Sequence, residues 1–296
     1  MADTILESLS AGNIFNLRGV VAVVTGGGTG IGMMISSTLV ANGATVYIIG
    51  PVQADLDNVC ATYNAACENA SAPGRMHGIQ GDIRLKRQRD SQRKSARAKT
   101  PLPSSSTTLG STGGRYARPG PTATATDYVA AFFDAVSDED FADTLNTNSV
   151  GPYWMTFAFL PLLERWKAST KPDASKFVPQ IIMTSSMNGW TKDPATSGFS
   201  YPYLFSKSAL GHATSSLAHE LLPLGIRVNG IAPRDSTGVS VFPATYHPAF
   251  QVPTVSGVGS ARDMGTLALF LVANWFVNGE TVLIDGGTLL KHPSSY

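Results

Sequence analysis

The stretch TGGGTGIG, Thr25 to Gly32, decides the fold that this sequence predicts. It follows the apolar run VVAVV (20–24), typical of a buried parallel strand, and precedes IGMMISSTLVANGA, which predicts a helix ending near Gly43. Glycines at such a turn let the backbone approach a pyrophosphate, whose charge meets the free N–H groups at the helix N-terminus. We therefore expect a dinucleotide-binding turn here, with a tight turn that holds no ligand as the alternative.

Two more strands follow in quick succession, over residues 45–50 and 75–82, with a helix over 53–70 between them. Strands separated by helices at this spacing imply right-handed crossovers and a parallel sheet. Further along, the pattern predicts helices over 127–166, 201–223 and 261–273, and strands over 177–186, 226–233 and 280–287. The prediction is an α/β fold: a single Rossmann-like domain over 1–296, doubly wound, with helices on both faces of the sheet.

Composition excludes several other classes of protein. The chain has 296 residues, of which 43% are apolar, and only two cysteines, Cys60 and Cys67. Two cysteines are too few for a disulfide framework, and no Cys/His spacing fits a metal site, so we expect two reduced thiols on one helix and no metal. The N-terminal stretch carries Asp3 and Glu7 where a secretory signal would be basic, and no apolar run is long enough to span a bilayer. These features predict a soluble, cytoplasmic protein without a membrane partner.

The charge is unevenly distributed along the chain. Ten Lys and Arg residues and one acid fall between Arg84 and Arg118, whereas the rest of the chain carries 12 basic and 20 acidic residues. Residues 84–126 also lack a sustained apolar run, so we interpret them as a basic, low-complexity insertion. A nucleic-acid-binding arm over RLKRQRDSQRKSARAK (84–99) is the alternative, but no aromatic side chain is interleaved in that stretch to stack on bases. We therefore expect no nucleic-acid partner.

Tyr203 and Lys207 lie four residues apart in YPYLFSK, on one face of a predicted helix. A tyrosine titrates near ~10, and a fixed ammonium beside it lowers that pKa by stabilising the phenolate. Such a pair can act as a general acid and base on a carbonyl or alcohol oxygen, although the same spacing also occurs in ordinary surface pairs. Ser185 and Ser186 end a predicted strand upstream, and Asn148 lies on the preceding helix.

Taken together, these motifs resemble the short-chain dehydrogenase/reductase family, in the form common among fungal enzymes. The resemblance covers the whole chain apart from the basic insertion. Its matching elements are Thr25, Gly26, Gly30 and Gly32 of the glycine turn, Asp82, Asn148 with Gly151, the strand-end serine, Tyr203 with Lys207, RVNGIAP and the closing DGG.

The resemblance implies an NAD(P)(H)-dependent oxidoreductase that transfers hydride between nicotinamide and a small carbonyl or alcohol substrate. It implies that Tyr203 is the acid/base, that Lys207 lowers its pKa and holds the ribose hydroxyls, and that Asn148 carries a proton-relay water. Ser186 would position the substrate oxygen, with Ser185 as the alternative serine. The implied cofactor-binding residues are Thr25, Gly26, Gly28, Thr29, Gly30, Ile31, Gly32, Asp82, Ile83, Tyr203 and Lys207. Family members pair into homodimers or homotetramers, which we expect here too.

The choice between NADP and NAD depends on the end of the second strand. A carboxylate there would bind the ribose 2′-hydroxyl of NAD, and an arginine would favour the 2′-phosphate of NADP. Gly50 and Pro51 occupy those places, so neither signal is present. Because no acid repels a phosphate, we favour NADP and keep NAD as the alternative.

One element of the family pattern is missing from the sequence. The fourth strand should read as several apolar residues followed by Asn-Asn-Ala-Gly, yet Ser104 to Ser111 reads SSSTTLGS. Codons for these residues, read one base earlier, allow Leu-Leu-Val-Asn-Asn-Ala-Gly-Ile, so we hypothesise that residues of about 84–119 are frame-shifted. The alternative is a true insertion. For the sequence as it stands, we expect the fourth strand to be damaged or missing. The second functional hypothesis is therefore an inactive dinucleotide-binding scaffold or a non-functional product.

A second departure is Arg234, which stands where the family usually has glycine. It puts the loop geometry and the substrate access in doubt. Residues 234–260 are expected to form the substrate lid, with a plain surface loop as the alternative. Trp190, Phe199 and Tyr201 suggest an apolar carbonyl substrate or simply pack their loop.

Overall fold

The computed structural model describes residues 2–70, 72–84, 104–107, 112–170, 176–234 and 259–296. They form a seven-stranded sheet in the order β3-β2-β1-β4-β5-β6-β7, and every pairing in it is parallel. The order reverses direction between β1 and β4, which defines the switch point of a doubly wound sheet. The α/β fold predicted from the sequence is confirmed. Its strands are β1 (Val21–Thr25), β2 (Thr45–Gly50), β3 (Arg75–Gln80), β4 (Ser104–Thr107), β5 (Gln180–Thr184), β6 (Arg227–Pro233) and β7 (Thr281–Ile284).

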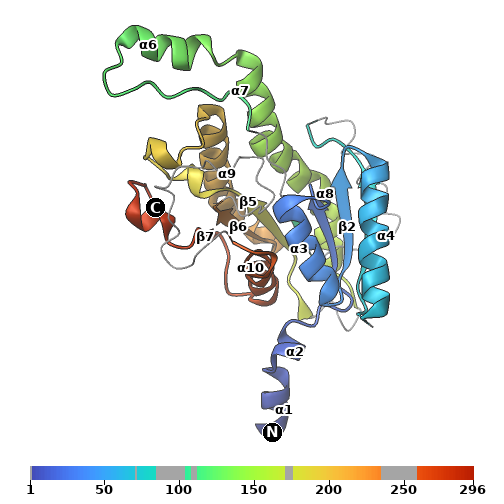
Figure 1. Cartoon of the computed structure of the whole chain (residues 1–296). Helices are drawn as coiled ribbons and strands as arrows, with labels where there is room; N and C mark the ends of the chain where they lie inside the picture. Colours follow the sequence, from blue (N-terminus) through green and yellow to red (C-terminus); the bar gives the residue numbers. More distant parts are fainter. Residues whose placement is uncertain (1, 71, 85–103, 108–111, 171–175, 235–258) are drawn as a thin grey trace.

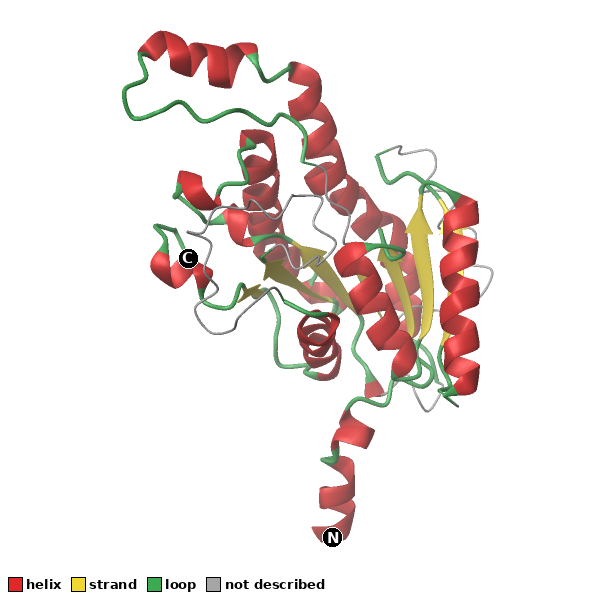
Figure 2. Cartoon of the chain, viewed as in Figure 1, coloured by secondary structure: helices red, strands yellow, loops and turns green. Residues whose placement is uncertain are grey.

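Helices cover both faces of this sheet (Figures 1 and 2). One face carries α3 (Gly30–Ala41), α4 (Gln53–Asn69) and α10 (Ala261–Ala273), and the other carries α8 (Gly151–Lys167) and α9 (Tyr201–Glu220). Alternation along β1 divides its side chains between two cores, because Val23 packs with α8 and α9 whereas Val24 packs with α3 and α10. The switch point therefore lies between two fully packed layers.

The fourth strand is present, although it is short. Residues Ser104–Thr107 pair with β1 on one side and with β5 on the other, in register with Ala22–Thr25 and Gln180–Met183. Of the two expectations for this strand, damaged or missing, the second is corrected, and the place predicted for the strand is confirmed. The backbone can satisfy its ladder there because strand hydrogen bonds do not depend on side-chain type. Within the segment predicted to be frame-shifted, residues 85–103 and 108–111 lie outside the described part of the chain, whereas residues 84 and 112–119 are described.

The long helix predicted over 127–166 is divided into several pieces. After α6 (Ala125–Val129) the chain forms a π-helical turn, η1 (Ala130–Asp134), breaks before Ser137, and continues in α7 (Asp138–Leu145). Ser137 and Asp140 form a capping box that starts α7 afresh. A second π-helical turn, η2 (Asn146–Val150), leads into α8. The break leaves α6 on an arm that projects beyond the sheet (Figure 1).

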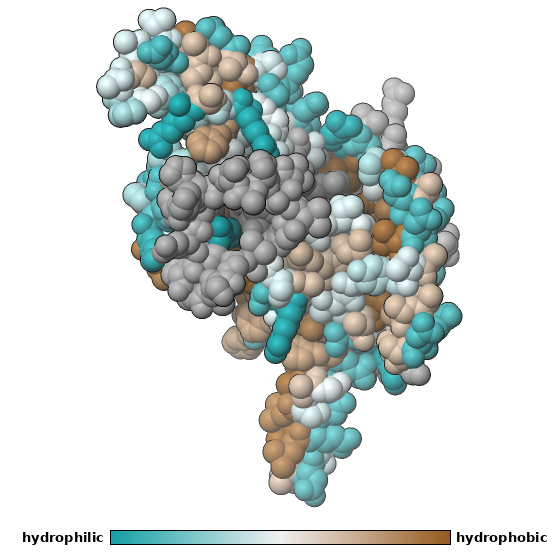
Figure 3. Space-filling model, viewed as in Figure 1, coloured by the Kyte–Doolittle hydropathy of each residue, from teal (hydrophilic) through white to brown (hydrophobic). Residues whose placement is uncertain are grey.

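At the other end of the molecule, α1 (Ala2–Ser8) and α2 (Ala11–Ile14) project from the body. Ile5 and Leu6 on α1, and Leu9 just after it, are exposed and form an apolar side, which Figure 3 shows beside a hydrophilic one. Within the described residues, no helix combines the length and the apolar character needed to cross a membrane. The two cysteines lie on α4 as free, buried thiols, as predicted.

Candidate functional site

The predicted phosphate-binding turn leads from β1 into α3. Gly26 and Gly30 adopt left-handed backbone conformations, with φ of 64° and 50°, which L side chains rarely adopt. The Gly26 amide donates to the Ile49 carbonyl at the end of β2, which fixes the turn to the neighbouring strand. Thr29 precedes α3 in an extended conformation. Glycine is therefore required at both ends of this turn by its geometry.

Gly27 packs the turn closely against the second strand. A Cβ atom on Gly27 would lie 2.6 Å from Cγ2 of Ile48 and 2.8 Å from Oγ of Ser36, both shorter than real contacts. On Gly28 the nearest atom would be Cδ2 of Leu56 at 3.4 Å, an ordinary contact. The predicted set of cofactor-binding residues omits Gly27, because spacing alone does not indicate which glycine is enclosed.

The residues of the turn fit a dinucleotide phosphate. The side chain of Thr29, which precedes the first turn of α3, makes no capping hydrogen bond, so that turn keeps its backbone N–H groups for another acceptor. Gly28 leaves room for a group to approach the backbone. Ile31 is half-buried and Gly32 is buried against the core side of the helix. Among the described residues, no group of His, Cys, Asp and Glu side chains is arranged to hold a metal ion.

Asp82 follows β3, as predicted, and its carboxylate is engaged by Arg84. The guanidinium of Arg84 contacts both carboxylate oxygens, at 3.0 Å from Nε and 2.7 Å from Nη2. Ile83 is buried in the core, where its Cδ1 atom would be 2.9 Å from a Cβ on Gly151. Only the backbone of Ile83 could therefore face a cofactor, and a group that binds Asp82 would have to share it with Arg84.

Tyr203 and Lys207 lie on the first two turns of α9, above the end of β5. Nζ of Lys207 donates to the Thr184 carbonyl at 2.8 Å and lies 5.6 Å from the centre of the Tyr203 ring. The lysine is 2% exposed, and burial lowers its pKa to about 8. Ser200 caps this helix by accepting a hydrogen bond from the Tyr203 amide. The structure thus brings the predicted acid/base pair to the carboxyl edge of the sheet.

The two serines that follow β5 differ in their hydrogen bonds. Ser185 Oγ donates to the Lys207 carbonyl at 2.8 Å, so its hydroxyl is used to dock α9 on the strand. Ser186 Oγ donates to the Pro233 carbonyl at a longer 3.3 Å and accepts from the Asn188 amide at 3.2 Å. The hydroxyl of Ser186 is therefore the less firmly held of the two.

Asn148 lies within the π-helical turn η2 and is fully buried. Its Nδ2 atom donates to Ser206 Oγ at 2.9 Å, and Ser206 in turn donates to the Tyr203 carbonyl at 2.7 Å. A π-helical turn widens a helix locally and is frequent at functional sites. Asn148 is therefore connected to the same turn of α9 that carries Tyr203.

The three aromatic residues named for the substrate pocket lie in two groups. Phe199 and Tyr201 pack with Tyr116, which lies in the segment that leads to α6, at ring-centroid distances of 6.1 and 5.5 Å. Trp190 instead contacts Tyr296 near the C-terminus, at 5.0 Å. Arg234 follows β6, with its amide donating to the Ile284 carbonyl, and residues 235–258 of the predicted lid lie outside the described part of the chain.

Comparison with known proteins shows the family and the fold of this chain. The family model for short chain dehydrogenase matches residues 20–237. The chain is 32% identical to the short-chain dehydrogenase/reductase PhomF of Diaporthe leptostromiformis, over 100% of both chains. It is 29% identical to the short-chain dehydrogenase/reductase VdtF of Byssochlamys spectabilis, over 98% of this chain and 99% of that one. The solved RhlG/NADP active-site complex of Pseudomonas aeruginosa shares the fold, with a TM-score of 0.74 at 23% identity over 93% of this chain and 98% of that one.

These matches and the doubly wound sheet identify the protein as a nicotinamide-dependent oxidoreductase. More particularly, the chain belongs to the short-chain dehydrogenase/reductase family and is of the fungal type.

Proposed function

We propose that this protein transfers hydride between a nicotinamide cofactor and the carbonyl or alcohol carbon of a small apolar substrate, with Tyr203 exchanging the proton. The observation that carries the proposal is the buried ammonium of Lys207 beside the Tyr203 ring. A cation held in a low-dielectric site stabilises a phenolate far more than one in water does. Tyr203 can then give up or take a proton at neutral pH.

The remaining groups have separate roles in this proposal. Ser186 hydrogen-bonds the substrate oxygen, because its own contacts are long enough to be exchanged for a substrate. Lys207 holds the ribose hydroxyls in addition to its effect on Tyr203. Asn148 positions a water molecule that relays the proton to Tyr203. When bound, the nicotinamide supplies the hydride chemistry, and the protein supplies orientation and the path for the proton.

The cofactor would bind at the turn from Thr25 to Gly32, with Asp82 and the Ile83 backbone toward the adenine. We favour NADP because Gly50 and Pro51 place no acid at the end of β2. The Pro51→Asp variant introduces such an acid at an exposed position, and Pro51→Asn is its uncharged control. In Pro51→Asp, but not in Pro51→Asn, the dissociation constant for NADPH should rise relative to that for NADH. Tighter binding of NADH by the wild type would contradict the preference.

The experiment that tests the function is replacement of Tyr203 by Phe. The variant keeps the ring and loses only the hydroxyl, so it should bind the cofactor as the wild type does and reduce no carbonyl compound. A broad panel of apolar aldehydes and ketones serves as substrate. Retained turnover in Tyr203→Phe would exclude the proposed role.

A second candidate, an inactive dinucleotide-binding scaffold, is favoured by the composition of β4. Ser104–Thr107 has no apolar residue, although it lies between two strands that are buried along their whole length. Arg234, which stands where the family usually has glycine, also favours this candidate. Cofactor binding without turnover of any compound in the panel would support this candidate.

We further propose that the protein is a homodimer or homotetramer that pairs through α8 and α9. Tyr153 and Phe157 on α8 and Phe205 on α9 are large apolar side chains that are more than one-third exposed, as is Tyr201. Such a surface is typical of an interface between subunits. Light scattering should give a mass of two or four chains, and Phe205→Glu should reduce it. The cytoplasmic location and the single-domain organisation stay predictions.

A further inference from the structure

The loop that joins Ser186 to Tyr203 is held from outside by the C-terminal segment. Residues 292–296, which we call the tail, run antiparallel to residues 190–193 of this loop, with a bridge between Thr191 and Ser294. The Lys192 amide donates to the Pro293 carbonyl at 2.7 Å, and the Ser295 amide donates to the Trp190 carbonyl at 2.8 Å. The two segments are nearly a hundred residues apart in sequence, so the tail is an added support for the loop.

A side-chain pair closes this contact at one end. Nδ1 of His292 lies 2.7 Å from Oδ2 of Asp193, and the two side chains are 12% and 22% exposed. Burial raises the pKa of Asp193, but the hydrogen bonds from His292 and from the Ala195 amide outweigh it and leave the pKa below its usual value. The pair is therefore a charge-assisted hydrogen bond at a largely buried position, stronger than an exposed one.

Asp193 also shapes the chain that leads to Tyr203. Its second oxygen accepts from the Ala195 amide and caps the short 3₁₀ helix η5 (Pro194–Thr196). After η5 the chain reaches Phe199, a non-glycine residue with φ of 56°, and then Ser200, which caps α9. A left-handed phenylalanine persists only where the surroundings hold it. Asp193 thus connects the tail to the segment that sets where α9 begins.

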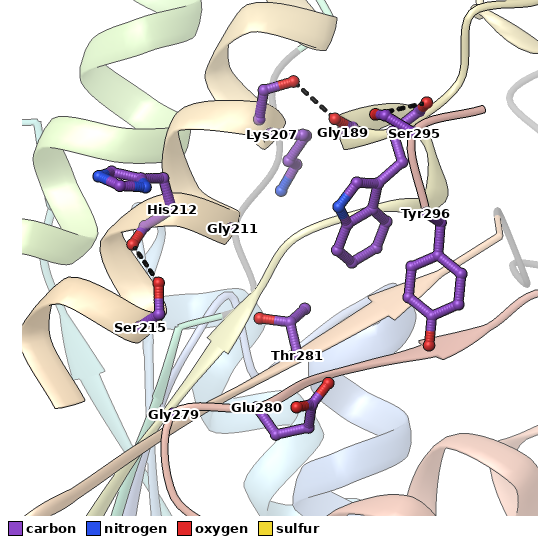
Figure 4. Close-up of a pocket in the computed structure, with 12 residues that line it drawn as sticks. Gly189, Lys207, Gly211, His212, Ser215, Gly279, Glu280, Thr281, Ser295 and Tyr296 are labelled. Atoms are coloured by element: carbon purple, nitrogen blue, oxygen red, sulfur yellow. Dashed lines mark hydrogen bonds between the residues drawn. The ribbon is translucent and has the colours of Figure 1, made fainter. Parts of the chain in front are cut away.

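The tail reaches α9 mainly through this loop. A cavity of about 520 Å³ separates Ser295 and Tyr296 from His212 and Ser215 on α9, as Figure 4 shows. The loop itself contacts the helix at Gly189, whose carbonyl accepts from Ser208 Oγ at 2.7 Å. Among the residues that line the cavity, the tail therefore does not pack directly on this part of α9. Among the described residues, the contacts thus connect the tail to Tyr203 through the loop.

We propose that His292 and Asp193 are positioning residues: their hydrogen bond holds the loop between Ser186 and Tyr203 and so fixes the relative placement of these two groups. The inference rests on the proposed function and adds to it, because no motif of the sequence indicates His292. Small displacements of reacting groups have large effects on rate, since a shift of ~1 Å can cost ~100-fold. The pair would therefore influence the rate of the reaction more than the binding of the cofactor.

The test compares three variants of the full chain. His292→Ala removes the bond; His292→Asn is the conservative rescue, since its Nδ2 atom can replace Nδ1 of the imidazole; and Lys291→Ala is the matched control, an exposed neighbour on α11 (Thr288–Lys291). We expect kcat to fall about tenfold in His292→Ala, with the NADPH dissociation constant within about twofold of the wild-type value. His292→Asn should recover most of the loss, and Lys291→Ala should behave as the wild type.

Amide hydrogen exchange gives a second readout that needs no turnover. In His292→Ala, exchange should accelerate at residues 194–204 as well as in the tail, and Lys291→Ala should leave both unchanged. If acceleration is confined to the tail, or if kcat is unaltered, the positioning role is overturned. If the wild type turns over no substrate, the proposed function fails, and the exchange at 194–204 still decides whether the pair holds the loop.

Discussion

Lys207 is buried beside Tyr203, with its ammonium 5.6 Å from the centre of the phenol ring and no more than 2% of the residue exposed. Burial gives the lysine a pKa of about 8, well below its ordinary value, because it disfavours the charged form. The lysine is therefore cationic at neutral pH and loses its charge in a range where an exposed lysine keeps it.

The first prediction concerns pH. Above about pH 8 the folded protein loses the Lys207 charge, so kcat/KM for carbonyl reduction should fall. Lys207→Met should lose this pH dependence along with most of its activity.

The same shift predicts a pH dependence of stability. In the unfolded chain, Lys207 keeps its proton up to about pH 10.4. The unfolded chain therefore binds more protons than the folded chain between these values, and the free energy of unfolding should rise with pH by about 3 kcal/mol across that window. Chemical denaturation of wild type and Lys207→Met at several pH values measures the difference; equal slopes would contradict the assignment.

The second prediction separates the two serines. Ser185→Ala removes a buried hydrogen bond to the Lys207 carbonyl and should cost ~1 kcal/mol of unfolding free energy with a modest loss of kcat. Ser186→Ala should reduce kcat by ~100-fold or more while changing stability little. Each variant is the control for the other in the same assays. The reverse pattern would make Ser185 the residue that contacts substrate.

The third prediction concerns the glycine turn. Gly27→Ala would force a methyl group into Ile48 and Ser36, so we expect a loss of ~1–3 kcal/mol and weaker cofactor binding. In Gly28→Ala the methyl group would meet Leu56 at 3.4 Å and Ile48 at 3.8 Å, both ordinary contacts, so the variant should fold as the wild type does, with cofactor affinity alone reduced. Thermal melts and NADPH titration of both variants check this. Normal cofactor affinity in Gly28→Ala would place the phosphates elsewhere.

The fourth prediction tests the fourth strand. Ser105 is in register with Val23 on one side and Ile181 on the other, and both of those residues are fully buried. Replacing residues 104–111 by Leu-Leu-Val-Asn-Asn-Ala-Gly-Ile should raise the free energy of unfolding by more than ~2 kcal/mol, since apolar side chains would add buried area in the centre of the sheet. Urea denaturation of the two proteins measures it. A loss of stability would argue that the serine-rich segment is native to this position.

The sequence predicted most of the sheet because its strands, β4 apart, are largely apolar and several of its turns are marked by glycine. Val21–Thr25 and Thr45–Gly50 are clear in the sequence, and the spacing of Tyr203 and Lys207 indicated the pair that we propose as the acid/base. The break before α7 was not predicted, because capping at Ser137 interrupts a pattern that periodicity alone continues.

Long-range contacts of the site were also beyond sequence reasoning. The pairing of His292 with Asp193 joins residues 99 apart, and nothing local to either residue marks it. The engagement of Asp82 by Arg84 was missed for a different reason, since the basic stretch was interpreted as an insertion. Gly27 is enclosed where the turn packs closely against β2, and the spacing of the glycines alone does not indicate this.

In the proposed reaction, Tyr203 exchanges the proton during nicotinamide-dependent reduction. The most direct measurement follows NADPH oxidation by the wild type and by Tyr203→Phe over the panel of apolar carbonyl compounds, alongside cofactor titration of both proteins. We expect turnover by the wild type, a loss of at least ~1,000-fold in the variant, and equal cofactor affinity in the two. Undiminished turnover in Tyr203→Phe, or cofactor binding by the wild type without any turnover, would contradict the proposed reaction.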